Sequence, residues 1–290
     1  MRIAIASGKG GTGKTTVAAN LAALLHSKGL SVTALDCDVE EPNLHLLLHP
    51  DWESEQTVGV PVPVIDTKAC LGPSCSKCTT LCRFAALAMM GDEVMIFMEM
   101  CHGCGLCTLA CPPRAITESS RNIGVVRKGQ CKGQAAGITV TGGALRIGEA
   151  MSPPLISAVL DNAPQADIVL VDCPPGTSCP MIRATQDADF SILVTEPTPF
   201  GLHDLGLAAE VLRQAELPFG AVINRQGMGD DAALDFLERE NIPLLGTLPH
   251  SLQAATIYSE GRLHVETLPD FAALYEAIWQ AVLNQLGGLK

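Results

Sequence analysis

The stretch SGKGGTGKTT, residues 7–16, decides the fold. A short apolar run, residues 2–6, precedes it, and apolar residues with helical spacing follow it. Residues 8–15 match the pattern G-x-x-x-x-G-K-S/T, in which backbone N–H groups converge on phosphate oxygens at the positive end of a helix. The sequence therefore predicts a loop that binds a nucleoside triphosphate, with these residues in contact: Gly8, Lys9, Gly10, Gly11, Thr12, Gly13, Lys14, Thr15 and Thr16. Lys14 is expected to neutralise phosphate charge, and Thr15 to join a Mg²⁺ shell.

Short apolar runs and helical patterns alternate along much of the chain. The expected strands are residues 2–6, 31–36, 167–172, 190–195, 219–224 and 243–248. Helices are expected directly after the loop, ending before Gly29, and near 152–162, 203–216, 230–241 and 271–286. This alternation predicts an α/β fold with a doubly wound, mostly parallel sheet.

The alternation stops between about residue 58 and residue 150, where cysteines are concentrated. We interpret this region as an insertion. The expected organisation is a nucleotide-binding domain over 1–58 plus 150–290, an inserted α+β domain over 59–120, and a β linker over 121–149. An internal repeat lies inside the insertion, because CSKCTTLC (75–82) is echoed by CGLCTLAC (104–111).

The second copy of the repeat belongs to a cysteine run, Cys101 to Cys111, of spacing x₂, x₂, x₃ followed by proline, which is the bacterial ferredoxin pattern for [4Fe-4S] clusters. In that pattern the fourth cysteine binds the other cluster. One predicted cluster therefore uses Cys101, Cys104, Cys107 and Cys82. The other uses Cys70, Cys75, Cys78 and Cys111. The alternatives are a Cys₄ zinc site and, because the first loop is two residues longer, a [3Fe-4S] cluster with Cys70 uncommitted.

Lys9, directly after the first glycine, gives the loop the deviant pattern of the MinD, ParA and nitrogenase iron protein superfamily, which the chain resembles. LDCDVEEPN (35–43), DCPPGTSCP (172–180), VTEPTPFGLHDL (194–205) and INR (223–225) extend the resemblance over essentially the whole chain, as for the members with an inserted ferredoxin domain. One departure is Ser251, near which relatives tend to carry an acid.

The resemblance implies roles for individual residues and an ATP-bound homodimer. Lys9 is expected to reach the partner's phosphates, and Asp38 to orient the attacking water. Asp172 is expected to hold Mg²⁺ through water, with Thr15 and Asp38 at the same ion, and Lys9, Lys14, Asp38 and Asp172 form the implied catalytic set. Asn224, with Arg225, is expected at the base, although Asn224 could equally be a turn residue.

Four cysteines lie outside the two runs. Cys37 and Cys173 are expected in the core, and Cys131 as a free thiol. Cys179 stands seven residues after Asp172, as a cluster-ligating cysteine does in the nitrogenase iron protein. It is either a metal-binding residue at a dimer interface or a structural turn cysteine.

Composition narrows the class of partner. With 19 Lys and Arg against 31 Asp and Glu, the formal net charge is −12, so neither a nucleic acid nor an anionic membrane is an expected partner. No signal peptide pattern or membrane-spanning run is evident, and a cytoplasmic location is expected. The last predicted helix has no basic residue before Lys290, so it is expected to pack on the sheet rather than anchor a membrane.

Three functions remain in competition at this point. The first is an ATPase, slow without its partner, that uses ATP, ADP, Mg²⁺ and two [4Fe-4S] clusters. Its dimerisation would gate electron transfer or delivery of metal–sulfur cargo to a redox or metallocluster partner. The second is an assembly or positioning switch of the MinD and ParA kind, with structural or redox-sensing clusters. The third is an electron carrier without ATPase activity, which the intact loop disfavours.

Overall fold

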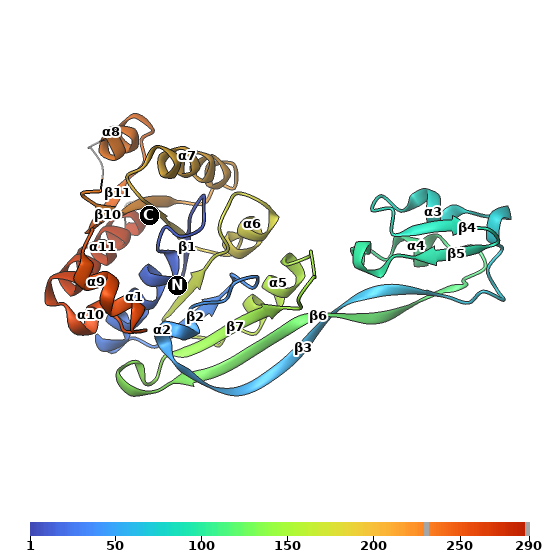
Figure 1. The fold of residues 1–290 in the computed structure, drawn as a ribbon, viewed down its shortest axis with the longest axis horizontal. Coiled ribbons are helices and arrows are strands. Elements are labelled where there is room, and N and C mark those ends of the chain that lie inside the picture. The colour runs from blue at the N-terminus through green and yellow to red at the C-terminus, as the bar shows by residue number, and fades with distance from the viewer. Residues whose placement is uncertain (229–231, 288–290) are drawn as a thin grey trace. The chain divides into compact units, whose positions relative to one another are not determined.

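The computed structural model describes residues 1–228 and 232–287, which form two compact units (Figure 1). The large unit comprises Met1–Glu55, Val126–Ala144 and Ile156–Lys290. The small unit comprises Gln56–Val125 and Leu145–Leu155, within the region where the predicted alternation stops.

The large unit is built on a mostly parallel sheet, as the sequence predicts. Each of the pairs β1–β8, β1–β9, β2–β8, β2–β7, β9–β10 and β10–β11 is parallel. In the described residues the strand order is β11 (Leu244–Pro249), β10 (Phe219–Gln226), β9 (Phe190–Thr195), β1 (Arg2–Ala6), β8 (Ile168–Asp172), β2 (Val32–Asp36), β7 (Thr139–Leu145), β6 (Ile116–Cys131) and β3 (Pro50–Ile65).

The β6 strand is antiparallel to both of its neighbours. Cys131 N donates to Ile138 O (2.9 Å) and Arg146 N to Ile123 O (2.8 Å), which pairs β6 with β7 in opposite directions. Strands β3 and β6, each of 16 residues, begin or end in the large unit and continue into the small one. The sequence predicted a β linker over 121–149, but the pairing of two strands of this length was not predicted, because glycines and prolines interrupt the alternation of apolar residues.

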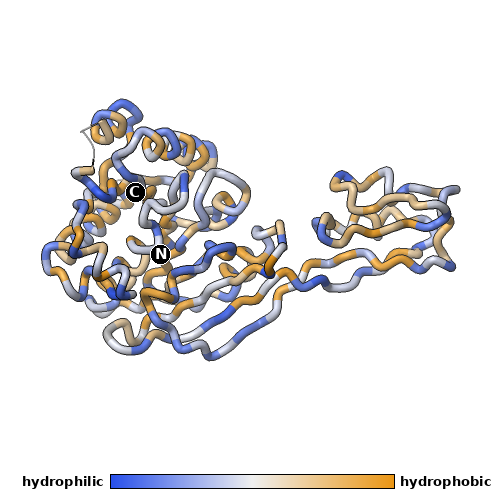
Figure 2. The backbone as a smooth tube through the Cα atoms, in the orientation of Figure 1, coloured by the Kyte–Doolittle hydropathy of each residue, from blue (hydrophilic) through white to orange (hydrophobic). Residues whose placement is uncertain are grey.

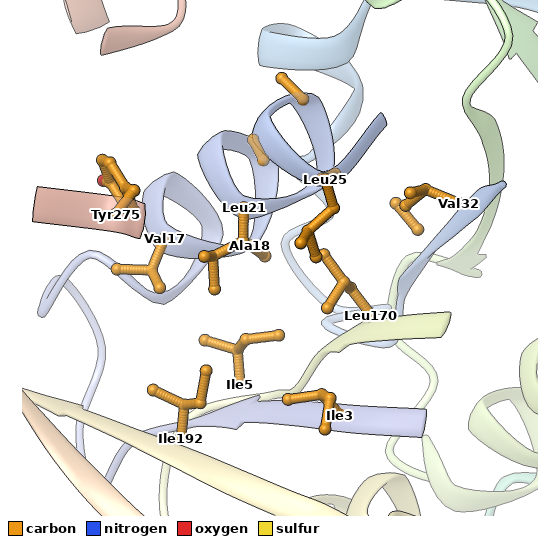
Figure 3. Packing of buried hydrophobic residues seen from close by; sticks show 14 of the residues in the cluster. Ile3, Ile5, Val17, Ala18, Leu21, Leu25, Val32, Leu170, Ile192 and Tyr275 are labelled. Atoms are coloured by element: carbon orange, nitrogen blue, oxygen red, sulfur yellow. The ribbon is translucent and has the colours of Figure 1, made fainter. Parts of the chain in front are cut away.

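Helix α1 (Lys14–Ser27) covers the sheet next to the phosphate loop. Its apolar face packs on Ile3 and Ile5 of β1 and on Leu170 and Ile192 of the neighbouring strands (Figure 3). Burying each such side chain stabilises the fold by roughly 1.5–3 kcal/mol. Gly29, with φ +86°, ends the helix at the predicted position.

The remaining helices agree in part with the prediction. Helix α7 begins earlier than predicted, because Thr198 caps it by accepting a hydrogen bond from Gly201 N (3.1 Å). Residues 230 and 231 of the predicted helix 230–241 lie outside the described residues. Besides α1, the described part of the large unit contains the helices α2 (His45–Leu48), α6 (Cys179–Thr185), α7 (Pro199–Gln214), α8 (Ala232–Arg239), α9 (Leu252–Ser259), α10 (His264–Thr267) and α11 (Pro269–Gly287). Helix α5 (Pro153–Asp161) begins in the small unit and ends in the large one. The apolar face of α11, including Tyr275 and Ile278, lies in the same core as α1.

The small unit contains two structurally matching copies of the predicted repeat. The five-residue helices α3 (Lys77–Leu81) and α4 (Leu106–Ala110) pack together. Left-handed residues precede them at 76 and 105 and follow them at 85 and 114, a constant offset of 29 residues. The short elements β4 (Leu87–Met90), β5 (Glu93–Ile96), η1 (Gly72–Ser74) and η2 (Met98–Met100) complete this part of the small unit.

Among the described residues, the small unit buries few large apolar side chains. One buried cluster consists of Val62, Ala86 and Cys101, with Cys82 packed against it. Other buried apolar residues of the unit are Val60, Leu87, Ala115, Ile116, Ile123 and Leu155. Figure 2 shows that hydrophobic residues are nevertheless frequent along its chain. Large apolar side chains exposed on it are Val64, Leu71, Leu81, Phe84, Met90, Met95, Phe97, Met98, Met100, Leu106, Leu109 and Ile147.

Candidate functional site

The phosphate loop runs from the end of β1 to the first residue of α1. Gly11 and Gly13 have φ of +78° and +100°, values that non-glycine residues rarely adopt. A Cβ on Gly8 would lie 2.0 Å from the carbonyl oxygen of Asp204, and one on Gly13 would lie 2.3 Å from Asn224 Nδ2. Gly11 and Gly13 are therefore explained by their backbone conformation. At Gly8 and Gly13, neighbouring atoms also leave no space for a side chain.

A cleft beside this loop brings together most of the predicted nucleotide-binding residues. Its wall contains Gly10, Gly11, Gly13, Lys14, Thr15, Thr16, Asp38, Asn224 and Arg225. Sequence reasoning missed several other wall residues, which come from segments without a phosphate-loop signature: Glu41, Asn43, Pro175, His250, Tyr258, His264, Phe271 and Tyr275. Ser251 also lies in the wall, and its hydroxyl caps α9 by accepting a hydrogen bond from Ala254 N (3.2 Å). A capping role accounts for a small hydroxyl residue at this departure from the family pattern.

Three carboxylates gather at the ends of β2 and β8, and Lys14 lies near two of them, Asp38 and Asp172. Burial raises the pKa of Asp38 to about 6 and that of Asp172 to about 7, although the positive charge of Lys14 opposes both shifts. Asp36 accepts hydrogen bonds from Asp38 N (3.2 Å) and Leu44 N (3.0 Å), so it braces the segment that follows β2. Burial and the neighbouring Asp172 raise the pKa of Asp36.

The carboxylate of Asp172 has an unusual environment. The Thr15 hydroxyl lies close enough to lower its pKa, but among the described residues neither of its buried oxygens has a hydrogen-bond partner of good geometry. A buried carboxylate of this kind is costly unless a cation or a water compensates it. Asp172 therefore fits the predicted magnesium role, in which bound water and the ion would supply the missing partners.

The side chain of Lys9 is paired with a residue that the sequence did not predict as its partner. Its ammonium group forms an ion pair with the carboxylate of Glu196, just after β9. Arg225 Nη1 donates to the other oxygen of the same carboxylate (2.7 Å), and Arg225 Nη2 donates to Gly11 O (3.1 Å). Asn224 Nδ2 donates to Thr12 O (2.8 Å). The predicted base-binding residues thus contact the backbone of the phosphate loop directly.

In the small unit, the eight predicted cluster ligands line two cavities. One cavity is bounded by Cys70, Cys75, Cys78 and Cys111, together with Leu71, Val94 and Ile116 among other residues. The backbone N–H of Ala115 donates to Cys111 Sγ (3.2 Å). The four cysteines therefore include one, Cys111, from the second copy of the repeat.

The second cavity contains the complementary set. Its wall includes Cys82, Cys101, Cys104 and Cys107, and also Cys78. Phe84 and His102 lie in the same wall, and their rings stack with centroids 3.7 Å apart and planes 8° apart. His102 is thus engaged by an aromatic ring next to the cysteines.

The side chains are not arranged around a single ion. Within residues 1–228 and 232–287, no three His, Cys, Asp or Glu side chains are grouped to hold one metal ion. In a [4Fe-4S] cluster each cysteine binds a different iron, so its ligands surround a larger space than the ligands of a single ion do. The two cavities fit the donor set and the division of ligands that such clusters require.

The remaining cysteines are separated from these cavities. Cys37 and Cys173 are fully buried, and Cys131 is buried in the core with a pKa raised by burial to about 12. Cys179 is exposed at the first turn of α6.

In the described part of the chain, no helix has the length and apolar character to cross a membrane.

Comparison with known proteins agrees with this geometry. Residues 3–265 match the family described as the CobQ/CobB/MinD/ParA nucleotide binding domain. An uncharacterized protein of Methanocaldococcus jannaschii is 30% identical over 79% of this chain and 82% of its own length. The iron-sulfur cluster carrier protein of Pyrococcus horikoshii is 24% identical over 87% of this chain and 75% of its own.

A solved structure shares the fold. The septum site-determining protein MinD of Pyrococcus horikoshii, complexed with Mg-ADP, superimposes with a TM-score of 0.58 at 23% identity, over 97% of this chain and 95% of that one. The phosphate loop, the parallel sheet and the family match lead to one conclusion. The chain belongs to the CobQ/CobB/MinD/ParA family of P-loop ATPases.

Proposed function

We propose that this ATPase is an iron–sulfur protein in which nucleotide-driven dimerisation gates electron transfer, or delivery of iron–sulfur cargo, to a partner protein. One observation carries the proposal. The two cavities of the small unit are lined by the two cysteine sets that ferredoxin spacing predicts, in a chain whose large unit carries a phosphate loop. We further propose that residues 59–120 are a ferredoxin-like domain and that 121–149 lead back to the ATPase domain.

The residues of the small unit fit two [4Fe-4S] clusters. Cys70, Cys75, Cys78 and Cys111 would hold one. Cys82, Cys101, Cys104 and Cys107 would hold the other. When bound, such clusters supply one-electron redox chemistry.

Metal ligation would also account for the stability of the small unit. In the part of the chain that the structure describes, few large apolar side chains of this unit are buried, and small domains with little core often gain stability from metals or disulfides. All eight cysteines in question are free thiols in the structure.

The residues of the large unit fit hydrolysis of ATP with Mg²⁺. Lys14 is buried beside Asp38 and Asp172, where its charge would offset that of the transferred phosphate. Asp38 lies in the wall of the cleft and, with a pKa near neutrality, is suited to orient a water molecule and accept its hydrogen bond. Thr15, Asp38 and Asp172 would surround the ion.

Dimerisation across the nucleotide rests on Lys9. Because Lys9 is held by an ion pair rather than by the loop backbone, it can exchange that partner for phosphate. The relative named an iron-sulfur cluster carrier protein supports the cargo form of the proposal.

The test is an anaerobic EPR titration of the reduced protein with and without Mg-ATP, with iron and sulfide counted on the same sample. About eight irons per chain, and a potential or line shape that changes with Mg-ATP, are expected for two coupled clusters. A protein without iron after anaerobic reconstitution contradicts the iron–sulfur proposal. Spectra indifferent to Mg-ATP contradict gating, and then favour a switch with structural clusters.

A further inference from the structure

The carboxylate of Glu196 contacts two cations at the phosphate loop. Lys9 belongs to the loop, and Arg225 lies beside it. One carboxylate oxygen pairs with Lys9 and the other with Arg225 (2.7 Å). The Glu196 side chain is only 14% exposed. Burial alone would raise the pKa of Glu196, but Lys9 and Arg225 hold it below its usual range, so the carboxylate is ionised at neutral pH.

The segment that carries Glu196 is fixed against the loop by independent contacts. A Cβ on Gly201 would lie 2.5 Å from Glu196 O, and Thr195 Oγ1 donates to Gly201 O (2.9 Å). Gly8 meets the backbone of Asp204 on the same segment, α7. The backbone contacts of this segment therefore fix the position of the Glu196 carboxylate next to Lys9.

We propose that Glu196 is a positioning residue that holds Lys9 in the nucleotide-free chain and releases it to the triphosphate, while Arg225 keeps the carboxylate paired. This rests on the proposed function, in which Lys9 contacts phosphate in the dimer. Phosphate and carboxylate compete for the same ammonium group, so Glu196 sets how much triphosphate is needed to recruit Lys9.

The arrangement of the three charges favours this exchange. Removing the only cation from a largely buried carboxylate would leave an unpaired charge, which is strongly unfavourable. Here the second cation stays in place and is also anchored to Gly11 O (3.1 Å). Lys9 can therefore leave without leaving Glu196 unpaired.

The hold on Lys9 is tested first without nucleotide. Full-length protein is treated briefly with an amine-acylating reagent, and modification of Lys9 relative to the exposed Lys132 is measured by mass spectrometry. Because a partly exposed ion pair shifts an equilibrium by at most about fivefold, Glu196→Gln should raise relative labelling of Lys9 by about threefold. Glu196→Asp, which keeps the charge, should restore much of the protection. Glu210→Gln, on the exposed face of α7, is the matched control and should match wild type.

The release of Lys9 is tested by dimerisation. The concentration of a non-hydrolysable ATP analogue with Mg²⁺ that gives half-maximal dimer is measured by analytical ultracentrifugation. Glu196→Gln should lower this midpoint by about the same threefold, and Lys9→Ala should abolish the dimer.

The outcomes separate the two proposals. Unchanged Lys9 labelling in Glu196→Gln overturns the positioning role, whatever the dimer does. Raised labelling with an unmoved midpoint overturns the release to triphosphate. A wild-type chain that stays monomeric with the analogue overturns the proposed dimerisation and the release together, while the labelling result still decides whether Glu196 holds Lys9.

Discussion

Asp36 and Asp172 occupy register-paired positions at the carboxyl ends of the neighbouring parallel strands β2 and β8, and both side chains are buried. The proximity of Asp172 adds to the burial that raises the pKa of Asp36. Two acids so placed resist ionising together, and the nearby cation, Lys14, offsets only part of the cost at Asp172. The nucleotide-free site is therefore electrostatically unfavourable at neutral pH, and the divalent cation of the proposed function would relieve it.

The first prediction concerns stability against pH. A carboxyl group whose folded-state pKa is raised contributes stability below its unfolded pKa and loses it as pH rises through the folded pKa. For Asp38 and Asp172 the window is therefore from near pH 4 up through about 6 and about 7. We expect the free energy of unfolding of the nucleotide-free protein, measured by chemical denaturation, to fall between about pH 4 and about pH 7, and to fall less in Asp172→Asn, by an amount on the order of 2–4 kcal/mol. Equal slopes in the two proteins would contradict the raised pKa of Asp172, and added Mg-ADP should flatten the wild-type slope.

The second prediction concerns Gly8. A Cβ there would overlap the carbonyl of Asp204, so Gly8→Ala must separate the loop from α7 and should cost about 1–3 kcal/mol of stability. Gly10→Ala is the matched control, because a Cβ there meets nothing within 4 Å. Chemical denaturation of the two nucleotide-free proteins measures the difference. A Gly8→Ala protein as stable as Gly10→Ala would mean that α7 does not pack on the loop as the structure shows.

The third prediction separates the two chemistries of the chain. Lys14→Ala removes the charge that faces phosphate, and should weaken ATP binding by roughly tenfold to a hundredfold and abolish hydrolysis. Fluorescent-nucleotide titration and phosphate release measure these effects. Iron content should stay at the wild-type level, because Lys14 lies in the large unit and the eight cysteines assigned to clusters lie in the small unit. Loss of iron in this variant would argue that nucleotide binding is needed to build the clusters.

The fourth prediction tests the division of cysteines between the cavities. Cys111→Ala should remove the cluster whose other ligands come from the first copy, and Cys82→Ala the cluster whose other ligands come from the second. Each variant should lose about half of its iron and sulfide, and the two residual EPR signals should differ. The residual signal of Cys111→Ala should match that of Cys75→Ala, which lies in the same cavity. A match to Cys107→Ala instead would indicate that the cysteines are not exchanged between copies. Cys131→Ala, outside both cavities, is the control and should keep its full iron content.

Much of the large unit could be predicted because its signals are local. The phosphate loop, the buried strands and the end of α1 at Gly29 each follow from short-range patterns in the sequence. The cysteine spacing also predicted which cysteines line each of the two cavities. The same spacing in the two copies of the repeat implies that the backbone makes the same turn in both.

What the sequence could not show depends on contacts between distant segments. Glu196 meets Lys9 across 187 residues of chain, and neither residue carries a pattern that pairs it with the other. The full lengths of strands β3 and β6 were not predicted. Their sequences contain glycine and proline, and it is the pairing of the two strands that keeps the chain extended at these residues. The short helices α9 and α10 have too few turns for a periodic pattern, and Ser251 was read as a departure from the family rather than as a cap.

The matching copies of the small unit have a consequence for how it assembles. Each cavity takes two of its four assigned cysteines from one copy, a third from the segment just before that copy, and the fourth from the other copy. The fourth lies just beyond the short helix of its own copy. A peptide that carries one copy alone therefore has no complete ligand set for either cavity. The two halves must come together before either metal centre can be finished, so folding and cluster acquisition in this unit should behave as a single cooperative event.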